Sequence, residues 1–426
     1  MKCRKGLWFQ GAALLLIAIT LLLAPGAVAQ SKYKTLHRFK GGADGEFMYA
    51  GLVFDQKGNL YGATTEGGAG GKGTVFKLAP NADGSWTESV LYSFRGGTDG
   101  NTPYASLIFD QKGNLYGTTT DGGAQGNGAV FKLAPNTDGS WTESVIYSFL
   151  GGEDGRLPYA SLIFDQKGNL YGTTGHGGTG DNGTAFTLTP NADGSWTESV
   201  LYRFLGGKDG ALPGASLIMD PAGNLYGTTI YGNGGNSGRC LSGECGVVFE
   251  LMPNADGTWT ESLLYRFRGG KDGGNPEAGL IFDEAGNLYG TTSDLGGNCG
   301  TGCGVVFELT RQTDGSWVES VLHGFSGRDG DEPAAGLIFD AAGNLYGTTV
   351  VGGDLSLCNG GSGCGVVFKL TPNSNGKWTE TVLHRFLARP GSLPYAGLVF
   401  DASGNLYGTT FGDIRSTLGS VFEITP

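Results

Sequence analysis

The sequence predicts an all-β fold, a seven-bladed β-propeller with four antiparallel strands in each blade. One observation is a repeat: the string Gly-Asn-Leu-Tyr-Gly occurs seven times, with its asparagine at Asn59, Asn114, Asn169, Asn224, Asn287, Asn344 and Asn405. A second is that each repeat holds four short runs rich in β-branched and aromatic residues. A third is that no stretch has the 3.6-residue apolar period of a helix. Four-stranded units in succession are typical of propellers.

The second repeat illustrates the predicted strands. They are a (Ser106–Asp110), b (Leu115–Thr119), c (Ala129–Leu133) and d (Trp141–Phe149). Between a and b, an aspartate followed by Gly-Asn predicts a tight turn, because Asp bonds its own backbone and Gly accepts a positive φ. The segment 135–140, with Asp-Gly, predicts a second hairpin between c and d. Recurring aspartates in these turns are therefore interpreted as structural.

The two ends of the chain predict closure of the ring. The last repeat, formed by residues 391–426, contains runs a, b and c but no run d. Residues 33–42 supply the missing one, because Lys34–Gly42 matches the d run and the residues after it in the first repeat, Ser89–Gly97. A first strand that completes the last blade removes an open sheet edge. An open solenoid, the alternative, would need no such permuted unit.

Residues 1–29 have the pattern of a secretory signal peptide, which leaves residues 30–426 as the propeller. Lys2, Arg4 and Lys5 precede an apolar stretch, Ala12–Ala24, and Ala27-Val28-Ala29 resembles a cleavage site. An uncleaved anchor helix is the alternative, although the apolar run is short for a bilayer. We expect a secreted or periplasmic protein with no membrane span after cleavage, and a monomer.

Composition and charge limit the partners. The formal net charge of −12 and a charged fraction of only 16% disfavour nucleic acid and anionic membrane surfaces. We expect an extracellular glycan, a peptide or a cell-envelope protein as partner.

The repeated residues resemble a known family. The pattern Phe-x-Gly-Gly-x-Asp-Gly, then Gly-Leu-Ile-Phe-Asp-x-x-Gly-Asn-Leu-Tyr-Gly-Thr-Thr, then Gly-Val-Val-Phe-x-Leu-Thr-Pro, resembles the bacterial GloVer (choice-of-anchor) tandem repeats. The Asp-x-x-Gly-Asn-Leu-Tyr hairpin is also similar to that of NHL-type propellers. The resemblance implies a bacterial, exported propeller, but no chemistry. Asp-Gly-Ser-Trp is similar to the Asp-box of sialidases, with a shorter spacing, so no sialidase residue is carried over.

Six cysteines follow the predicted cleavage site, in three close pairs within the b–c loops. They are Cys240/Cys245, Cys299/Cys303 and Cys358/Cys364. Their shared loop position and the export signal favour three local disulfides. A metal site is the alternative, but two cysteines per blade without a neighbouring histidine make a poor zinc set, and we predict no metal and no cofactor.

The candidate binding residues lie in the variable loops. The d–a and b–c loops differ between blades and share one face of a propeller, and variable loops on a rigid scaffold are where binding is expected. The predicted ligand-binding residues are His176, Arg239, Glu244, Glu277, Asp294, Asp331, Glu332 and Asp354. Unselected variation of solvated loops is the competing interpretation. Tyr231 and Phe411 are the loop aromatics of interest.

The sequence predicts a binding or interaction scaffold rather than a specific enzyme. A catalytic triad has one candidate base, His176, which is the only histidine in a b–c loop, and no nucleophile lies near it in sequence. The alternative is an extracellular polysaccharide lyase or hydrolase that uses carboxylates such as Glu277, Asp331 and Glu332. A third possibility is a surface-display or adhesion module without a small-molecule site.

Overall fold

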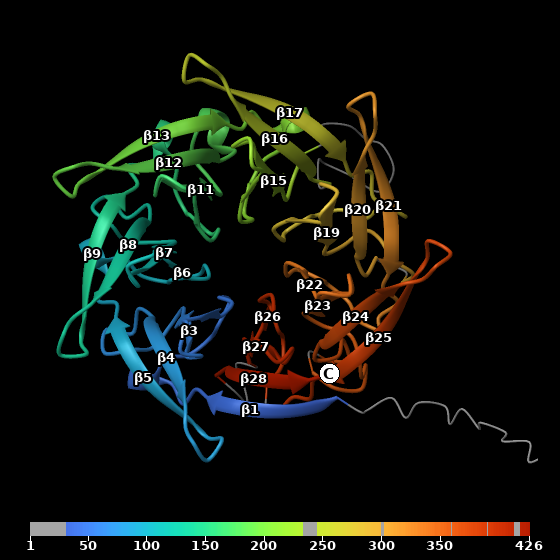
Figure 1. The fold of residues 1–426 in the computed structure, drawn as a ribbon, viewed down its shortest axis with the longest axis horizontal. Coiled ribbons are helices and arrows are strands. Elements are labelled where there is room, and N and C mark those ends of the chain that lie inside the picture. Colours follow the sequence, from blue (N-terminus) through green and yellow to red (C-terminus); the bar gives the residue numbers. More distant parts are fainter. Residues whose placement is uncertain (1–30, 233–244, 300–301, 359, 390, 413–417) are drawn as a thin grey trace, which may run out of the picture. The chain divides into compact units, whose positions relative to one another are not determined.

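Seven four-stranded antiparallel sheets form a closed ring (Figure 1). The computed structural model describes residues 31–232, 245–299, 302–358, 360–389, 391–412 and 418–426. Ser31–Pro426 forms one compact unit. Residues 1–30, which include the predicted signal peptide, lie outside the described residues. The fold prediction, a seven-bladed β-propeller, is confirmed.

Each blade runs from an inner two-residue strand to a long outer strand. The first three blades are β2 (Val53–Phe54), β3 (Leu60–Thr64), β4 (Thr74–Pro80) and β5 (Trp86–Ser93); β6 (Ile108–Phe109), β7 (Leu115–Thr119), β8 (Ala129–Pro135) and β9 (Trp141–Ser148); and β10 (Ile163–Phe164), β11 (Leu170–Thr174), β12 (Thr184–Pro190) and β13 (Trp196–Arg203). The next three are β14 (Ile218–Met219), β15 (Leu225–Thr229), β16 (Val247–Pro253) and β17 (Trp259–Arg266); β18 (Ile281–Phe282), β19 (Leu288–Thr292), β20 (Val305–Arg311) and β21 (Trp317–Gly324); and β22 (Ile338–Phe339), β23 (Leu345–Thr349), β24 (Val366–Pro372) and β25 (Trp378–Arg385).

The seventh blade joins the two ends of the chain. It contains β26 (Val399–Phe400), β27 (Leu406–Thr410), β28 (Ser420–Thr425) and β1 (Lys32–Arg38). Strand β1 pairs antiparallel with β28, from Lys32 opposite Thr425 to Arg38 opposite Ser420, and Figure 1 shows the blue β1 beside the red β28. The predicted ring closure is therefore confirmed, and it removes the free edge of β28.

Strand a is shorter than predicted. The repeat pattern predicts Ser106–Asp110, whereas only Ile108–Phe109 pairs with strand b. The residues just before the paired segment bond to the neighbouring blade instead, because the Gly51 N–H donates to Ser106 Oγ (2.8 Å) and the Ser106 N–H donates to Ser161 Oγ (2.9 Å). With the bond from the Ser161 N–H to Ser216 Oγ (3.2 Å), these contacts tie the inner ends of the first four blades to each other.

Almost no helix is present in the described residues, as the sequence predicts. The helical segments are five short 3-10 turns, η1 (Gly42–Asp44), η2 (Gly97–Asp99), η3 (Gly152–Asp154), η4 (Thr179–Asp181) and η5 (Gly207–Asp209). None of the helices in the described ranges is long and apolar enough to cross a membrane.

The hydrophobic core lies between blades. One buried cluster, for example, joins Phe149, just after strand d of the second blade, to Phe186 of the third, with Tyr116 and Leu170 beside them. The Phe149 and Phe186 rings meet edge to face, 5.1 Å apart between centroids. Equivalent clusters join the other neighbours in the ring, so each blade depends on the next for its apolar burial.

The a–b turn aspartates are structural, as the sequence indicates. Asp110 Oδ1 accepts hydrogen bonds from the backbone N–H groups of Lys112 (2.8 Å) and Asn114 (2.9 Å), and its Oδ2 accepts from Asn114 Nδ2 (2.7 Å) and the Tyr116 hydroxyl (3.2 Å). Gly113 completes the turn at φ 81°. A carboxylate with four such bonds is committed to the turn.

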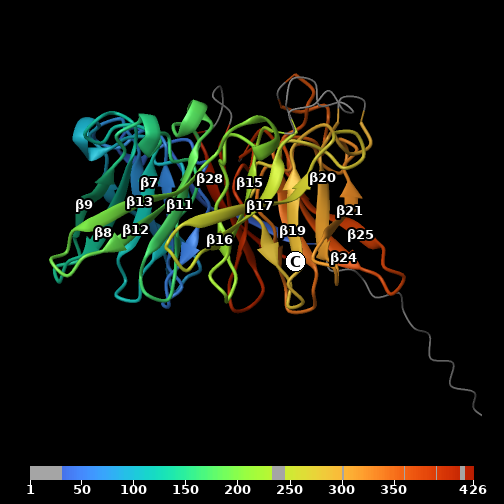
Figure 2. The same ribbon diagram turned by 90° about the horizontal axis from the view of Figure 1, so that it is seen from above.

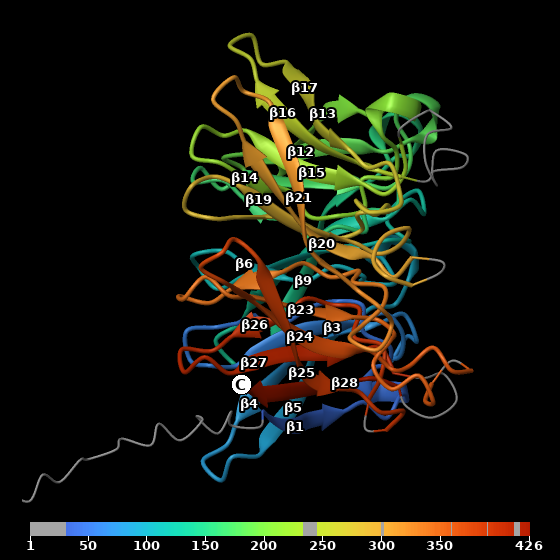
Figure 3. The same cartoon turned by 90° about the vertical axis from the view of Figure 1, so that its right-hand side faces the viewer.

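The connections fall on two faces, seen from the side in Figures 2 and 3. The d–a and b–c loops share one face, here called the loop face, where short bridges such as Arg156 to His176 pair them. The a–b and c–d hairpins form the other, here called the hairpin face. The predicted placement of the variable loops on one face follows from this topology.

Candidate functional site at the channel mouth

A cavity opens on the loop face at the mouth of the central channel. All seven blades contribute the residue just before the Ala that leads into strand a: Tyr49, Tyr104, Tyr159, Gly214, Glu277, Ala334 and Tyr395. His176, Leu212, Ile230 and Tyr231 complete the lining, and the cavity volume is about 440 Å³. This volume lies within the range of small-molecule sites.

A strained backbone turn holds each of these seven residues at the mouth. Two positions earlier in every blade, a residue other than glycine has a φ between 55° and 59°: Phe47, Thr102, Leu157, Leu212, Asn275, Glu332 and Leu393. In the second blade the Thr102 N–H donates to Lys72 O of the first blade (3.0 Å), and Thr102 O accepts from the Thr120 N–H (3.1 Å). Bonds to two neighbouring segments compensate for the left-handed conformation.

Four tyrosines from consecutive blades form one side of the cavity. Tyr395, Tyr49, Tyr104 and Tyr159 come from the seventh, first, second and third blades. Tyr49 and Tyr104 stack with centroids 4.3 Å apart, Tyr49 and Tyr395 are 5.0 Å apart, and Tyr104 and Tyr159 meet edge to face at 5.6 Å. Phe411 packs 4.8 Å from Tyr49. The rings support one another and are therefore held in place without a ligand.

The hydroxyl groups of these tyrosines differ from the others in the protein. Of 17 tyrosines, twelve have a hydroxyl that hydrogen-bonds to another described protein group. The five without such a bond are Tyr49, Tyr104, Tyr159, Tyr231 and Tyr395, and all five line the cavity. Because tyrosine hydroxyls inside a protein usually have a partner, these five are available to a ligand.

Carboxylates gather on the opposite side. Glu277 Oε1 accepts a hydrogen bond from Ser293 Oγ (3.0 Å); solvent reaches its side chain through the mouth, although protein surrounds most of it. Burial raises the pKa of Glu277, and the nearby Asp294 adds to this increase. Burial also raises the pKa of Glu332, with contributions from Asp331, Glu277 and Asp294. Burial, with a contribution from Asp294, raises the pKa of Asp331 as well, so Glu277, Asp331 and Glu332 each hold a proton more strongly than a free carboxyl group.

His176, in the b–c loop of the third blade, also lines the cavity, next to an ion pair between Arg156 and Asp181. Arg156 binds Asp181 through two bonds, Nη2 to Oδ2 (2.7 Å) and Nε to Oδ1 (3.3 Å). His176 Nδ1 is 3.6 Å from the same Oδ2. The hydrogen bond from Arg156 is the largest cause of the lowered pKa of Asp181. At 3.6 Å the His176 ring is near this ion pair but beyond hydrogen-bond distance of it.

The predicted site residues divide into three groups. His176 and Glu277 line the cavity. Asp294 is close enough to raise the pKa of Glu277. Asp331, Glu277 and Asp294 are close enough to raise the pKa of Glu332. Asp354 lies apart, in a recess with Arg328, Leu355 and Arg385. Arg239 and Glu244 lie outside the described residues. The sequence interpretation missed the four ring tyrosines, because Tyr49, Tyr104 and Tyr159 recur in near-identical blades and look like part of the repeat.

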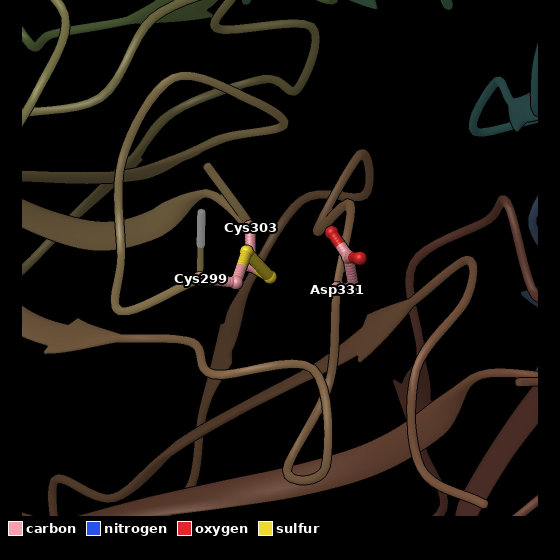
Figure 4. A group of neighbouring side chains, drawn as sticks. All are labelled: Cys299, Cys303 and Asp331. Carbon is pink, nitrogen blue, oxygen red and sulfur yellow. A yellow bond between two sulfur atoms is a disulfide. The ribbon is translucent and has the colours of Figure 1, made fainter. Parts of the chain in front are cut away.

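The cysteine loops border the same face. Cys299–Cys303 and Cys358–Cys364 form the predicted disulfides, with Cα–Cα distances of 5.8 and 5.3 Å. The predicted partner of Cys245, Cys240, lies outside the described residues. Asp331 approaches the first disulfide (Figure 4). Because both sulfurs are bonded to each other, they are not thiolate ligands, and this group of three does not form a metal site.

These features define a class of protein: a seven-bladed propeller with a ligand-sized cavity at its channel mouth. The sequence profile of the Gloeobacter/Verrucomicrobia repeat family matches residues 26–241 and 240–426. The chain belongs to this family, and the resemblance to GloVer repeats is confirmed.

Three of the solved structures with a similar chain are named as enzymes. A gluconolactonase from Xanthomonas campestris is 16% identical over 92% of this chain and 89% of its own, with a TM-score of 0.41. A luciferin-regenerating enzyme is 14% identical over 75% and 90%, with a TM-score of 0.40. A putative oxidoreductase (glucose dehydrogenase) from Thermus thermophilus is 16% identical over 76% and 96%, with a TM-score of 0.43. No curated protein sequence matches the chain.

Proposed function

We propose that this protein is an exported binding protein that holds a saccharide in the cavity at the channel mouth. One observation carries the proposal: the five tyrosine hydroxyls without a partner among the described residues line the same cavity as Glu277. Burial raises the pKa of Tyr104, and it raises the pKa of Tyr395 to about 12. Both hydroxyls thus stay protonated at neutral pH and can donate. A wall of hydroxyl donors with a facing carboxylate acceptor suits a ligand with many hydroxyl groups.

The geometry favours a saccharide over a cationic ligand. An aromatic cage for an ammonium group needs open ring faces. Here the faces of Tyr49 and Tyr104 pack on each other with an interplanar angle of 19°, so these rings do not form an open cage. Peptides and cell-envelope proteins are alternative partners, and binding of either in place of a saccharide would count against the proposal.

Export is part of the proposal. Two disulfides are consistent with an oxidising extracellular or periplasmic environment. The signal-like pattern of residues 1–29 would direct the chain there. Mass spectrometry of the protein recovered from periplasm and medium, after expression of the full sequence, tests this: a mature chain that begins near Gln30 supports it, and an intact N-terminus in the cytoplasm contradicts it.

The binding experiment removes the hydroxyls and keeps the rings. A panel of neutral oligosaccharides is titrated by calorimetry into the wild type and into the variant Y49F/Y104F/Y159F/Y395F. We expect at least tenfold weaker binding in the variant, since each lost hydrogen bond costs about 0.5–1.5 kcal/mol. The control is Y61F/Y116F, which removes hydroxyls that bond to turn aspartates on the hairpin face. Equal affinity of the wild type and the mouth variant, or no binding of any saccharide, refutes the proposal.

An enzyme is the second candidate, and one observation favours it. Glu277 combines a raised pKa with a place in the cavity wall, as a general acid requires. If the saccharides that bind are also cleaved, and E277Q abolishes cleavage while binding persists, the lyase or hydrolase interpretation replaces the binding protein. Unchanged saccharides after prolonged incubation would exclude cleavage of the panel.

A further inference from the structure

A second, separate groove lies on the hairpin face, between the second and third blades. Its volume is about 510 Å³. Tyr116, Phe164 and Trp196 form an aromatic wall, in which the Tyr116 ring meets Phe164 (5.2 Å) and Trp196 (6.0 Å) edge to face. Gln111 and Gln166 stand exposed at its border. The wall is aromatic and the border can form hydrogen bonds.

Three lysines surround this groove without ion-pair partners among the described residues. Lys112 and Lys167 extend from the a–b turns, and Lys132 on β8 places its Nζ 5.9 Å from the centroid of the Tyr116 ring. None of the three forms an ion pair with a described carboxylate. The groove carboxylates, Asp110 and Asp165, are already bound by their own turns. Positive charge is therefore left available to a ligand.

The lysines of the a–b turns are confined to one part of the ring, although strand c of the sixth blade also carries Lys369 opposite Tyr346. The a–b turns of the first three blades carry Lys57, Lys112 and Lys167, whereas the matching residues of the other four are Ala222, Ala285, Ala342 and Ser403. On strand c, Lys77 and Lys132 face the tyrosine of the inner hairpin, as their register with Tyr61 and Tyr116 shows. In the fourth blade Glu250 takes this position and accepts the Tyr226 hydroxyl (2.7 Å). The five lysines form a strip, here called the lysine strip.

We propose that the lysine strip and the groove bind an acidic polysaccharide, one with a carboxylate on its sugar rings. The lysines match the carboxylates, the glutamine amides match the hydroxyls, and the aromatic wall covers the apolar face of a sugar ring. The net charge of −12 repels a duplex nucleic acid, which carries one negative charge about every 1.7 Å along its axis. A flat anionic membrane would leave the recessed aromatic wall without contact. The more sparsely charged polysaccharide fits both the charge and the shape.

The experiment compares two polymers with the same sugar backbone, one with free carboxylates and one with uncharged methyl esters. Oligogalacturonate and its fully methyl-esterified form, at equal chain length, are titrated into the protein at low and high salt. We expect binding of the acid, at least tenfold weaker binding of the ester, and loss of affinity with added salt. The variant K112A/K132A/K167A should bind the acid at least tenfold more weakly. The control K208A/K271A/K377A removes three exposed lysines elsewhere and should stay within twofold of the wild type.

The outcomes separate this site from the channel mouth. Y49F/Y104F/Y159F/Y395F should bind oligogalacturonate like the wild type, so failure of one proposal leaves the other intact. The inference is overturned if the ester binds as well as the acid, or if both lysine variants lose the same affinity. It is also overturned if duplex DNA or anionic phosphatidylserine vesicles bind more tightly than the acid through these same lysines. The single variant K167A, in an exposed turn, provides a check if the triple variant has a lower Tm.

Discussion

Six half-buried glutamates should make the propeller more stable at mildly acidic pH than at alkaline pH. They occupy the same position of strand d: Glu88, Glu143, Glu198, Glu261, Glu319 and Glu380. One carboxylate oxygen of each is buried without a hydrogen-bond partner among the described residues. Each faces the aspartate of the loop that follows strand d of the preceding blade, as Glu143 faces Asp99. Burial, with a contribution from this aspartate, raises the pKa of all six to about 7.

The direction in which stability changes with pH follows from proton linkage. Between an unfolded pKa of 4.5 and a folded pKa of about 7, the folded protein holds protons that the unfolded chain lacks. This contribution to stability is fully present below pH 4.5 and is lost as the pH rises through 7. Two histidines change the stability in the opposite direction. Burial lowers the pKa of His37, and it lowers the pKa of His384 to about 4. The stability that these two neutral side chains contribute is therefore lost as the pH falls. The glutamates outnumber these histidines.

The change in stability is modest for each glutamate but large enough to measure for all six together. A shift of this size corresponds to about 3 kcal/mol without screening. Because the side chains remain partly exposed, solvent screening reduces it to about 1 kcal/mol each, or roughly 6 kcal/mol for all six. With an unfolding entropy of about 2.1 cal/mol/K per residue, a chain of this length should lose roughly 7 °C in Tm between pH 5 and pH 8.

Differential scanning calorimetry from pH 5 to pH 8 tests the prediction. Replacement of all six glutamates by glutamine should flatten the pH profile and raise Tm at pH 8. The control is E284Q, an exposed glutamate in an a–b turn, which should leave the profile unchanged. A wild-type Tm that is equal or higher at pH 8 than at pH 5, or an unchanged slope in the six-fold variant, refutes the reasoning.

Two further predictions concern the ends and the disulfides. Deletion of residues 31–40 removes β1 and exposes the edge of β28, so the shortened protein should aggregate or melt at lower temperature than one that lacks only residues 1–30; equal melting would contradict ring closure as a source of stability. Without reductant, iodoacetamide labelling and mass spectrometry should find Cys299, Cys303, Cys358 and Cys364 unmodified. Because these loops are short, reduction should cost less than the roughly 2–4 kcal/mol typical of disulfides; labelled thiols in the unreduced protein would contradict the pairing.

The fold was predictable because its signals are local and recur in every blade. Strand b of the second blade, Leu115–Thr119, was predicted to the residue, since a turn with its own hydrogen bonds defines where it begins. Strand a was predicted too long, because Ser106 has the sequence character of a strand but bonds to the neighbouring blade. That partner is 55 residues away in sequence. The local sequence pattern does not show which segment of the chain accepts the hydrogen bond of a given backbone N–H.

The site was predictable only where it departs from the repeat. Glu277 and His176 stood out because other blades have different residues there, and both line the cavity. Tyr104 and Tyr116 look equivalent as sequence, yet Tyr116 donates its hydroxyl to Asp110 and Tyr104 has no such partner among the described residues. The difference depends on where each ring lies in the assembled ring of blades. Sequence alone therefore identified the exceptional residues and missed the repeated ones.

Replacement of Glu277 by alanine should separate stability from binding. Ala334 occupies the equivalent position in the next blade, so the fold accepts alanine there. Glu277 instead places a carboxyl group where burial raises its pKa, and this cost grows as the pH rises and the group ionises. E277A should therefore have a higher Tm than the wild type, with a larger gain at pH 8 than at pH 5, while saccharide affinity falls. Stability given up at a binding site is the usual trade-off.

If E277A instead has a lower Tm at pH 8, the bond from Ser293 outweighs the cost of burial. Glu277 would then be explained by the fold, and the saccharide proposal would rest on the tyrosine hydroxyls alone.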